Sequence, residues 1–149
     1  MLEQKLEQDL KTAMLAGDSE RVMTLRNMKS ALLNVKVASG KRETGLSDDE
    51  VLPILSKEAK KRQESADFYV QGGSQDRADK ELSEKSIIEE YLPKQLSTEE
   101  ITAIVEEVIA ALGASGPSAM GQVMGQVKAK TGSTADGSIV AKIVKEKLA

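Results

Sequence analysis

The stretch "YLPKQLSTEE", residues 91–100, marks a boundary between two helical parts of the chain. Leu92 precedes Pro93, and the residue before a proline disfavours helical backbone geometry, so a helix should end there. Ser97 and Glu100 have the spacing of a capping box, in which the two side chains bond to free backbone N–H groups at a helix start. The stretch therefore predicts that one helix ends near residue 92 and that another begins at residue 97.

Toward the amino terminus, hydrophobic residues recur at helical spacing in four segments. Ser47 and Glu50 form another capping-box pattern at the start of the third segment. Glycines follow the first three segments, and glycine is the residue that most often ends a helix. We expect a four-helix amino-terminal domain of residues 1–92, with helices over residues 2–15, 19–39, 47–71 and 74–92.

Toward the carboxyl terminus, the same spacing predicts three further helices, over residues 97–112, 120–130 and 136–148. Asp136 can cap the last of them. These helices should form a small three-helix carboxyl-terminal domain of residues 97–149. No segment alternates in the manner of a strand, so the predicted fold class is all-α, with a four-helix part followed by a three-helix part.

The composition excludes much familiar chemistry. The 149 residues include no cysteine and no histidine, which removes disulfides, thiolate and imidazole metal sites, and Cys-His or Ser-His catalytic pairs. No glycine-rich loop follows a predicted strand, so neither a P-loop nor a dinucleotide fingerprint is present. From the residues we predict no catalytic residue, no metal site and no cofactor.

The first ten residues, "MLEQKLEQDL", carry acids at Glu3 and Glu7, where a targeting peptide would be basic or apolar. No run of about 18 apolar residues could span a membrane. On these grounds we expect a cytoplasmic protein without a membrane partner.

Two cations fall on faces that are otherwise apolar. Arg62 lies within the apolar arc of the third predicted helix, and Lys29 lies within that of the second. The favoured interpretation is that their stems cover the core while the charges reach water or a nearby acid such as Glu81 or Glu84; a ligand-binding role is the alternative. The neighbouring Lys57, Lys60 and Lys61 share an exposed stripe and are interpreted as a solvated face.

The stretch "MGQVMGQVKAKTGSTADGSIV", residues 120–140, places Gly121 and Gly125 one turn apart inside a helical pattern. An interior glycine costs a helix about 1 kcal/mol relative to alanine, so the pair requires a reason. Close packing against another helix is the first interpretation. The functional alternative is a phosphate-binding surface, because residues 120–149 have a net charge of +3 in a chain of net charge −3. Its lysines are Lys128, Lys130, Lys142 and Lys145.

Four segments together resemble the GatB/YqeY-domain family, and specifically a free-standing YqeY-like protein. They are "LRNMKSALLN", "KEAKKRQESADFY", "IIEEYLPKQLSTEE" and "MGQVMGQVKAKTGSTADGSIVAKIV", and the resemblance extends from about residue 2 to the end. It implies an all-helical, two-part fold. A similar domain forms the tail of the B subunit of the glutamine-dependent amidotransferase that acts on mischarged tRNA, and that tail is thought to contact tRNA.

The resemblance implies a non-catalytic tRNA-binding protein, accessory to aminoacylation or transamidation. Two alternatives stay open: a module that docks on an amidotransferase or an aminoacyl-tRNA synthetase, and a carbon-nitrogen ligase that uses glutamine as amido donor. The residues offer the ligase no nucleotide loop, metal cluster or amidase nucleophile. The resemblance implies that tRNA faces Gly121, Gly125, Lys128, Lys130, Asp136, Gly137 and Lys142. We add Lys145, because it lies one helical turn from Lys142.

The chain departs from the family pattern just before the "ADG" of residues 135–137. Relatives tend to be basic where Gly132, Ser133 and Thr134 stand here, and Gln122 occupies a position that is often lysine. Each lost cation removes one phosphate contact and the counterion release that accompanies it. We therefore expect tRNA binding to be weak.

Overall fold

The computed structural model of the protein describes residues 1–132 and 134–149, and Ser133 lies outside them. The described residues form seven α-helices and two short 3-10 helices and contain no strand, which confirms the all-α fold class. The elements are α1 (Leu2–Ala16), α2 (Ser19–Ser39), α3 (Asp48–Gln71), α4 (Gln75–Glu89), α5 (Thr98–Leu112), η1 (Pro117–Ala119), α6 (Met120–Thr131), η2 (Gly132–Thr134) and α7 (Gly137–Leu148).

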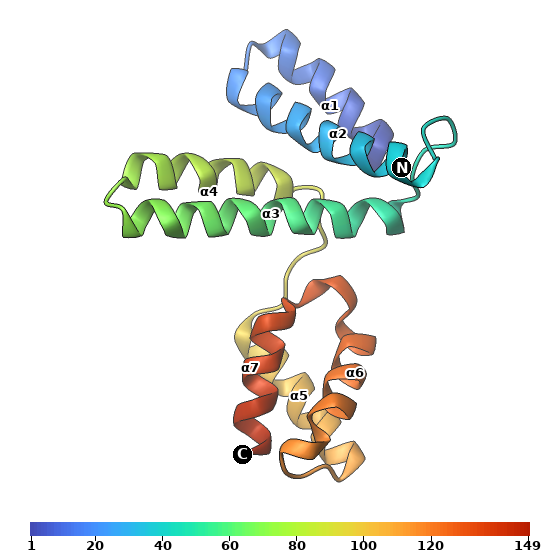
Figure 1. Ribbon diagram of the computed structural model, residues 1–149, viewed down its shortest axis with the longest axis vertical. Helices are drawn as coiled ribbons and strands as arrows, with labels where there is room; N and C mark the ends of the chain where they lie inside the picture. Colours follow the sequence, from blue (N-terminus) through green and yellow to red (C-terminus); the bar gives the residue numbers. More distant parts are fainter. The chain divides into compact units, whose positions relative to one another are not determined.

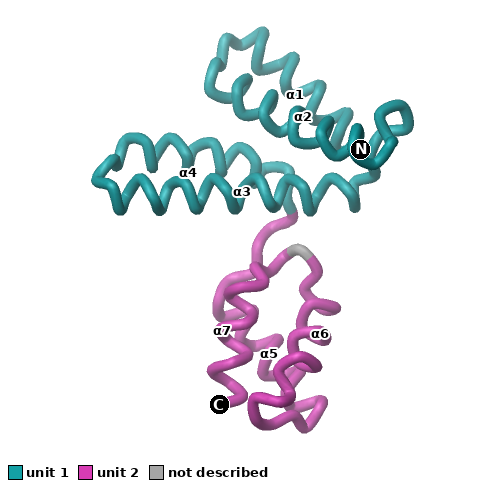
Figure 2. The backbone as a smooth tube through the Cα atoms, viewed as in Figure 1, with its two compact units in different colours: residues 1–92 teal, residues 93–149 magenta. Residues whose placement is uncertain are grey.

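The chain divides into two compact units, which Figure 2 shows in different colours. Unit 1 comprises Met1–Leu92 and unit 2 comprises Pro93–Ala149. Each unit has a hydrophobic core of its own.

Unit 1 consists of two helical hairpins, α1 with α2 and α3 with α4 (Figure 1). Gly17 takes a left-handed conformation, with φ of 70°, at the end of α1. Ser47 and Glu50 form the predicted capping box at the start of α3, where each side chain accepts a hydrogen bond from the other residue's backbone N–H. The fully buried side chains of the core, with exposures of 2% or less, include Leu6, Leu25, Met28, Leu32, Val51, Leu55 and Ile88.

The fourth helix is shorter than its hydrophobic pattern predicts. It ends at Glu89, and Tyr91 lies in the turn beyond it, where its backbone N–H bonds to the Ile88 carbonyl at 3.0 Å. The Tyr91 hydroxyl donates a hydrogen bond to the Asp9 carboxylate of α1. Ser74 occupies the N-cap position of α4, but its side chain makes no capping hydrogen bond.

The two cations on apolar faces pair with acids, as the favoured interpretation stated. Arg62 lies 3.5 Å from a Glu81 carboxylate oxygen and 3.6 Å from one of Glu84, both on α4. Lys29 lies 2.8 Å from the Glu7 carboxylate on α1, and both side chains are about half exposed. The contacts join helices within unit 1.

Unit 2 packs α5, α6 and α7 around a single core (Figure 1). Ser97 caps α5 by accepting a hydrogen bond from the Glu100 N–H at 3.1 Å. The backbone N–H of Leu96 donates to the Thr134 carbonyl at 2.7 Å, which ties the start of the unit to the turn before α7. The core residues of lowest exposure are Ile101, Val105, Val108, Val123, Val127 and Val144.

In the described part of the chain, no helix is long and apolar enough to cross a membrane. The same residues contain no group of three or more aspartate or glutamate side chains placed to hold a metal ion.

Candidate nucleic-acid interface

Gly121 and Gly125 of α6 are exposed and contact no other helix. A Cβ atom added at either position would meet no heavy atom of the described chain within 4 Å, beyond its own helix backbone and immediate neighbours. Close helix packing, the first interpretation of this pair, is therefore wrong. The spacing of hydrophobic residues in the sequence fits α6, but it cannot show which flank of the helix has a neighbour. The two glycines leave a strip of α6 backbone uncovered.

Two ion pairs identify the side of α6 and α7 that faces α5. Lys130 of α6 lies 2.9 Å from the Glu107 carboxylate, and Lys147 of α7 lies 2.7 Å from that of Glu106. Both acids belong to α5. These lysines are therefore partly neutralised.

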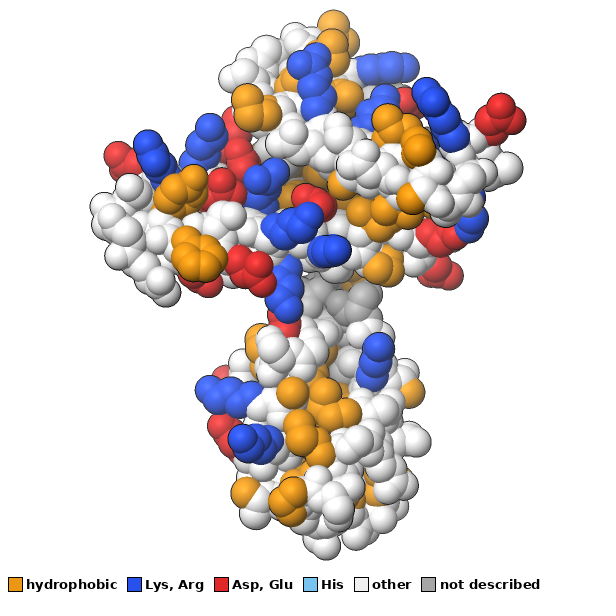
Figure 3. All heavy atoms as spheres, viewed as in Figure 1, with side chains coloured by type: hydrophobic (Ala, Val, Ile, Leu, Met, Phe, Trp, Pro, Cys, Tyr) orange, Lys and Arg blue, Asp and Glu red, His pale blue; other side chains and the backbone are white. Residues whose placement is uncertain are grey.

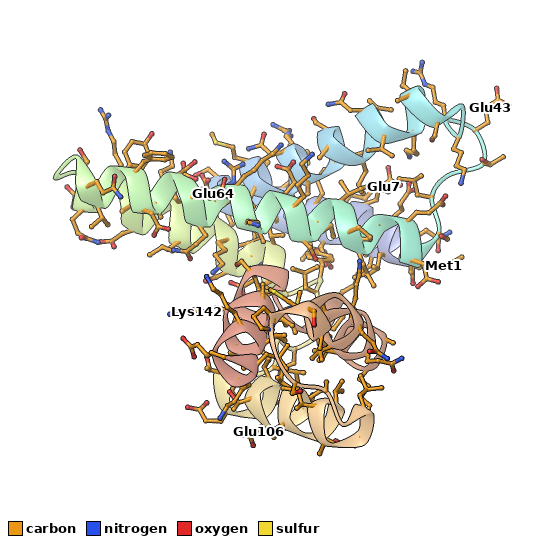
Figure 4. All side chains as sticks on the ribbon, turned by 60° about the horizontal axis from the view of Figure 1, so that its bottom comes forward. Met1, Glu7, Glu43, Glu64, Glu106 and Lys142 are labelled. Carbon is orange, nitrogen blue, oxygen red and sulfur yellow. The ribbon has the colours of Figure 1, made fainter. Side chains whose placement is uncertain are left out.

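The remaining lysines of unit 2's two last helices lie on the other side. At about 100° per residue, Lys128 is roughly 160° around α6 from Lys130 and shares a stripe with Gly121. On α7, Lys145 and Lys142 are roughly 160° and 140° from Lys147. All three are exposed, and no ion pair is recorded for them with any residue that the structure describes. Figure 4 shows Lys142 projecting outward from α7.

Figure 3 shows this side of unit 2 as a stripe of hydrophobic side chains between α6 and α7, with Lys or Arg side chains on both sides. Met120 and Met124 of α6 are half-buried and pack against the unit's core at this flank. We call the surface formed by Gly121, Gly125, Lys128, Lys142 and Lys145 the α6/α7 face. The hydrophobic spacing of the sequence places both methionines on the apolar face of this helix together with Val123 and Val127, and the structure agrees.

Asp136 and Gly137 lie at the start of α7. The Asp136 carboxylate accepts hydrogen bonds from the backbone N–H of Ser138 at 2.7 Å and from the Ser138 hydroxyl at 2.5 Å. Gly137 is the first residue of α7 and is exposed. The aspartate is thus the N-cap that the sequence predicts, and its carboxylate binds a free backbone N–H at the start of α7.

The α6/α7 face combines an uncovered backbone with three cations for which no ion pair with a described residue is recorded. Lysine ammonium groups bind phosphate as point charges, and a backbone without side chains lets a ligand approach closely. Helix α5 carries four acids, Glu99, Glu100, Glu106 and Glu107. Two of them, Glu107 and Glu106, pair with Lys130 and Lys147. The face is suited to a polyanion that makes contacts spread over two helices.

Fold and face together define a small all-helical protein with a lysine- and glycine-bearing surface on its second unit. The chain belongs to the Yqey-like protein family, whose model matches residues 3–148. The sequence resemblance to this family is thereby confirmed over nearly the whole chain.

Curated relatives come from yeasts and share one name. The chain is 34% identical to "Altered inheritance of mitochondria protein 41, mitochondrial" of Kluyveromyces lactis, over 85% of this chain and 69% of that protein. It is 33% identical to the protein of the same name from Vanderwaltozyma polyspora, over 70% of this chain and 56% of the relative. A third, from Lachancea thermotolerans, is 33% identical over 76% of this chain and 60% of its own length.

These names contradict the cytoplasmic location expected from the sequence, because each of these relatives is named as a mitochondrial protein. The expectation rested on Glu3 and Glu7. In the structure Glu3 pairs with Lys36 at 2.7 Å and Glu7 pairs with Lys29, both across the α1–α2 hairpin. Both acids thus have partners on α2 within unit 1.

Proposed function

We propose that this protein is a non-catalytic tRNA-binding protein, accessory to aminoacylation or transamidation, and that it contacts tRNA through the α6/α7 face. The observation that carries the proposal is the exposure of Gly121 and Gly125 beside cations that have no recorded ion pair with the described residues. Two helical glycines cost stability, and no intramolecular contact of the described residues compensates for them. A ligand backbone that approaches α6 closely supplies a reason for both.

The expected mode of binding is contact with the phosphate backbone. Lys128, Lys142 and Lys145 supply three separate charges, and the α6/α7 face has no aromatic ring on which a base could stack. Binding should therefore depend on salt and discriminate little between tRNA species. The neutral Gln122 and Gly132 keep the number of contacts small, so affinity at physiological salt should be weak.

Filter binding of bulk tRNA at two salt concentrations tests the proposal. The triple variant Lys128→Glu, Lys142→Glu and Lys145→Glu should lose most retention at low salt, and its residual binding should depend less steeply on salt. A matched control reverses three exposed lysines of unit 1, Lys11, Lys60 and Lys80, which changes the net charge equally. Equal retention by the two triple variants would contradict the assignment to this face.

A further inference from the structure

A groove of about 720 Å³ lies between α2 and α3 in unit 1. Its α2 wall is formed by Asn27, Ser30, Ala31, Asn34 and Val35, and its α3 wall by Pro53, Ile54, Lys57, Glu58, Lys61 and Arg62.

The α2 wall is polar and carries no charge. From Asn27, its residues recur after three and four positions and again after seven and eight, so they form a single stripe that faces α3. Asn27, Ser30 and Asn34 are exposed, and no side-chain hydrogen bond to another described residue is recorded for them. The wall thus offers two amides and a hydroxyl, which can both donate and accept hydrogen bonds.

The α3 wall is cationic. Lys61 lies 3.2 Å from the Glu58 carboxylate and remains 58% exposed, while Lys57 has no recorded ion pair with the described residues. Arg62 is held from α4 by Glu81 and Glu84, and its buried Nε has no hydrogen-bond partner among the residues described. Because Glu81 and Glu84 offset the charge of Arg62, the charges that line the groove are Lys57 and Lys61 against Glu58, a net of +1 in a unit whose total charge is negative.

The groove has the dimensions of a short extended peptide. From Asn27 to Val35, α2 rises about 12 Å, and four extended residues span about 13 Å. Lys57 and Lys61 are one helical turn apart, a rise of about 6 Å. Side chains on one face of an extended strand, at positions i and i+2, are separated by roughly 6.6 Å. Two acidic side chains on alternate residues therefore match the spacing of the two lysines.

We propose that the groove between α2 and α3 binds an acidic, extended peptide segment of a partner protein. The lysines of α3 pair with carboxylates on alternate residues of the peptide, and the amides of α2 bond to its backbone N–H and C=O groups. Ala31, Val35, Pro53 and Ile54 add small apolar contacts for the residues between the acids. This interaction goes beyond tRNA binding, since it uses another surface in another unit.

The lining favours a peptide over an RNA strand. None of the lining residues is aromatic, so the groove offers no platform for stacking bases, which is the main source of affinity for single strands besides charge. The uncharged wall of Asn27, Ser30 and Asn34 suits the alternating donors and acceptors of a peptide backbone.

Fluorescence anisotropy with the full chain tests this proposal. The probe is a short labelled peptide of alternating Glu and Ala; comparison probes are the same peptide with Gln in place of Glu, and polyuridine RNA. The wild-type protein should bind the Glu peptide and not the Gln peptide. Lys57→Glu with Lys61→Glu should weaken binding about tenfold or more, because two attractive contacts become repulsive. Asn27→Ala with Asn34→Ala should weaken it several-fold.

The control variant is Lys11→Glu with Lys80→Glu, which changes the total charge equally at exposed sites outside the groove. It should bind the Glu peptide as the wild type does, and far-UV circular dichroism should show every variant to be helical. Equal weakening in the control, no binding of the Glu peptide, or tighter binding of polyuridine that also depends on Lys57 and Lys61 would each overturn the peptide assignment. Failure of this test would leave the α6/α7 face unaffected, because the triple variant of unit 2 leaves the groove intact.

Discussion

The Lys130 ammonium lies 2.9 Å from the Glu107 carboxylate, so α5 neutralises one of the two lysines near the end of α6. Lys128, two residues earlier, lies on the opposite flank beside Gly121 and has no recorded acidic partner among the described residues. Two lysines that appear equivalent in the sequence therefore present different charges to a polyanion.

This difference predicts unequal effects of single substitutions. Lys128→Ala should lower the slope of log affinity against log salt for tRNA by about 1, because one phosphate contact is lost. Lys130→Ala should change that slope much less, since its charge is already engaged by Glu107. Filter binding across a salt series measures both slopes. Equal slopes for the two variants would show that the ion pair between Lys130 and Glu107 does not determine which of the two lysines binds tRNA.

Substitution of the exposed glycines separates stability from binding. Gly125→Ala should raise the free energy of unfolding by up to about 1 kcal/mol, because alanine is the better helix former and its Cβ meets open space. Gly121→Ala should raise it less, since the residue lies in the first turn of α6. Both should weaken tRNA binding if RNA approaches this backbone. Urea unfolding and filter binding on the same samples measure the two effects.

The control for these variants is Gly113→Ala at the end of α5. Gly113 has a φ of 61°, in the left-handed region, so alanine there should lower the free energy of unfolding by about 1 kcal/mol or more. Stabilised Gly121→Ala and Gly125→Ala variants with unchanged tRNA affinity would remove the functional explanation for the two glycines.

Local sequence signals predicted the fold well because they act over a few residues. The caps at Ser47 and Asp136 are seen as the sequence predicts, and Ser97 makes its half of the predicted capping box, since each cap depends on a side chain and an N–H within three positions. The end of α4 was predicted too late. Tyr91 continues the apolar spacing of that helix, but its hydroxyl bonds to Asp9, 82 positions away in the sequence.

The sequence predicts which residues belong to the candidate site, but it does not predict on which flank of α6 each of them lies. Hydrophobic periodicity shows that Gly121 and Lys130 are off the buried centre of α6, but only the position of α5 distinguishes the flank with a neighbour from the open one. The groove of unit 1 was still less visible, because Asn27 and Asn34 have no distinctive pattern of their own. Its lining comes from two helices, α2 and α3, and so depends on how these helices pack.

The contact between Tyr91 and Asp9 predicts a stability effect in unit 1. Tyr91 is 5% exposed, and burial together with the hydrogen bond to Asp9 raises the pKa of its hydroxyl. Tyr91→Phe should lower the free energy of unfolding by about 1–2 kcal/mol, since it leaves the Asp9 carboxylate without that donor. Urea unfolding measures the change, and Tyr69→Phe is the control, because no hydrogen bond of the Tyr69 hydroxyl is recorded with the described residues. Equal losses in both variants would contradict a specific role for the Asp9 contact.

Glu84 predicts a pH-dependent contribution to stability. Burial raises the pKa of its carboxyl above the ordinary value of 4.5, the Arg62 charge lowers it in part, and Glu81 adds to the increase. Above pH 4.5 the unfolded chain releases this proton while the folded chain retains it, so the free energy of unfolding should fall as pH rises toward the folded-state pKa. Glu84→Gln removes this titration. The stability of the wild type minus that of the variant should therefore decrease as pH rises from the ordinary pKa of 4.5 through the raised pKa of the folded state.

Urea unfolding of the wild type and of Glu84→Gln at a series of pH values measures this difference. Glu64→Gln, which removes an exposed carboxylate of α3, controls for the loss of one negative charge from unit 1. A difference that stays constant with pH would show that Glu84 ionises alike in both states, and one that increases with pH would show that the attraction of Arg62 at 3.6 Å outweighs the cost of burial. The sign of the change of this stability difference with pH therefore shows whether desolvation or the ion pair with Arg62 has the larger effect on the pKa of Glu84.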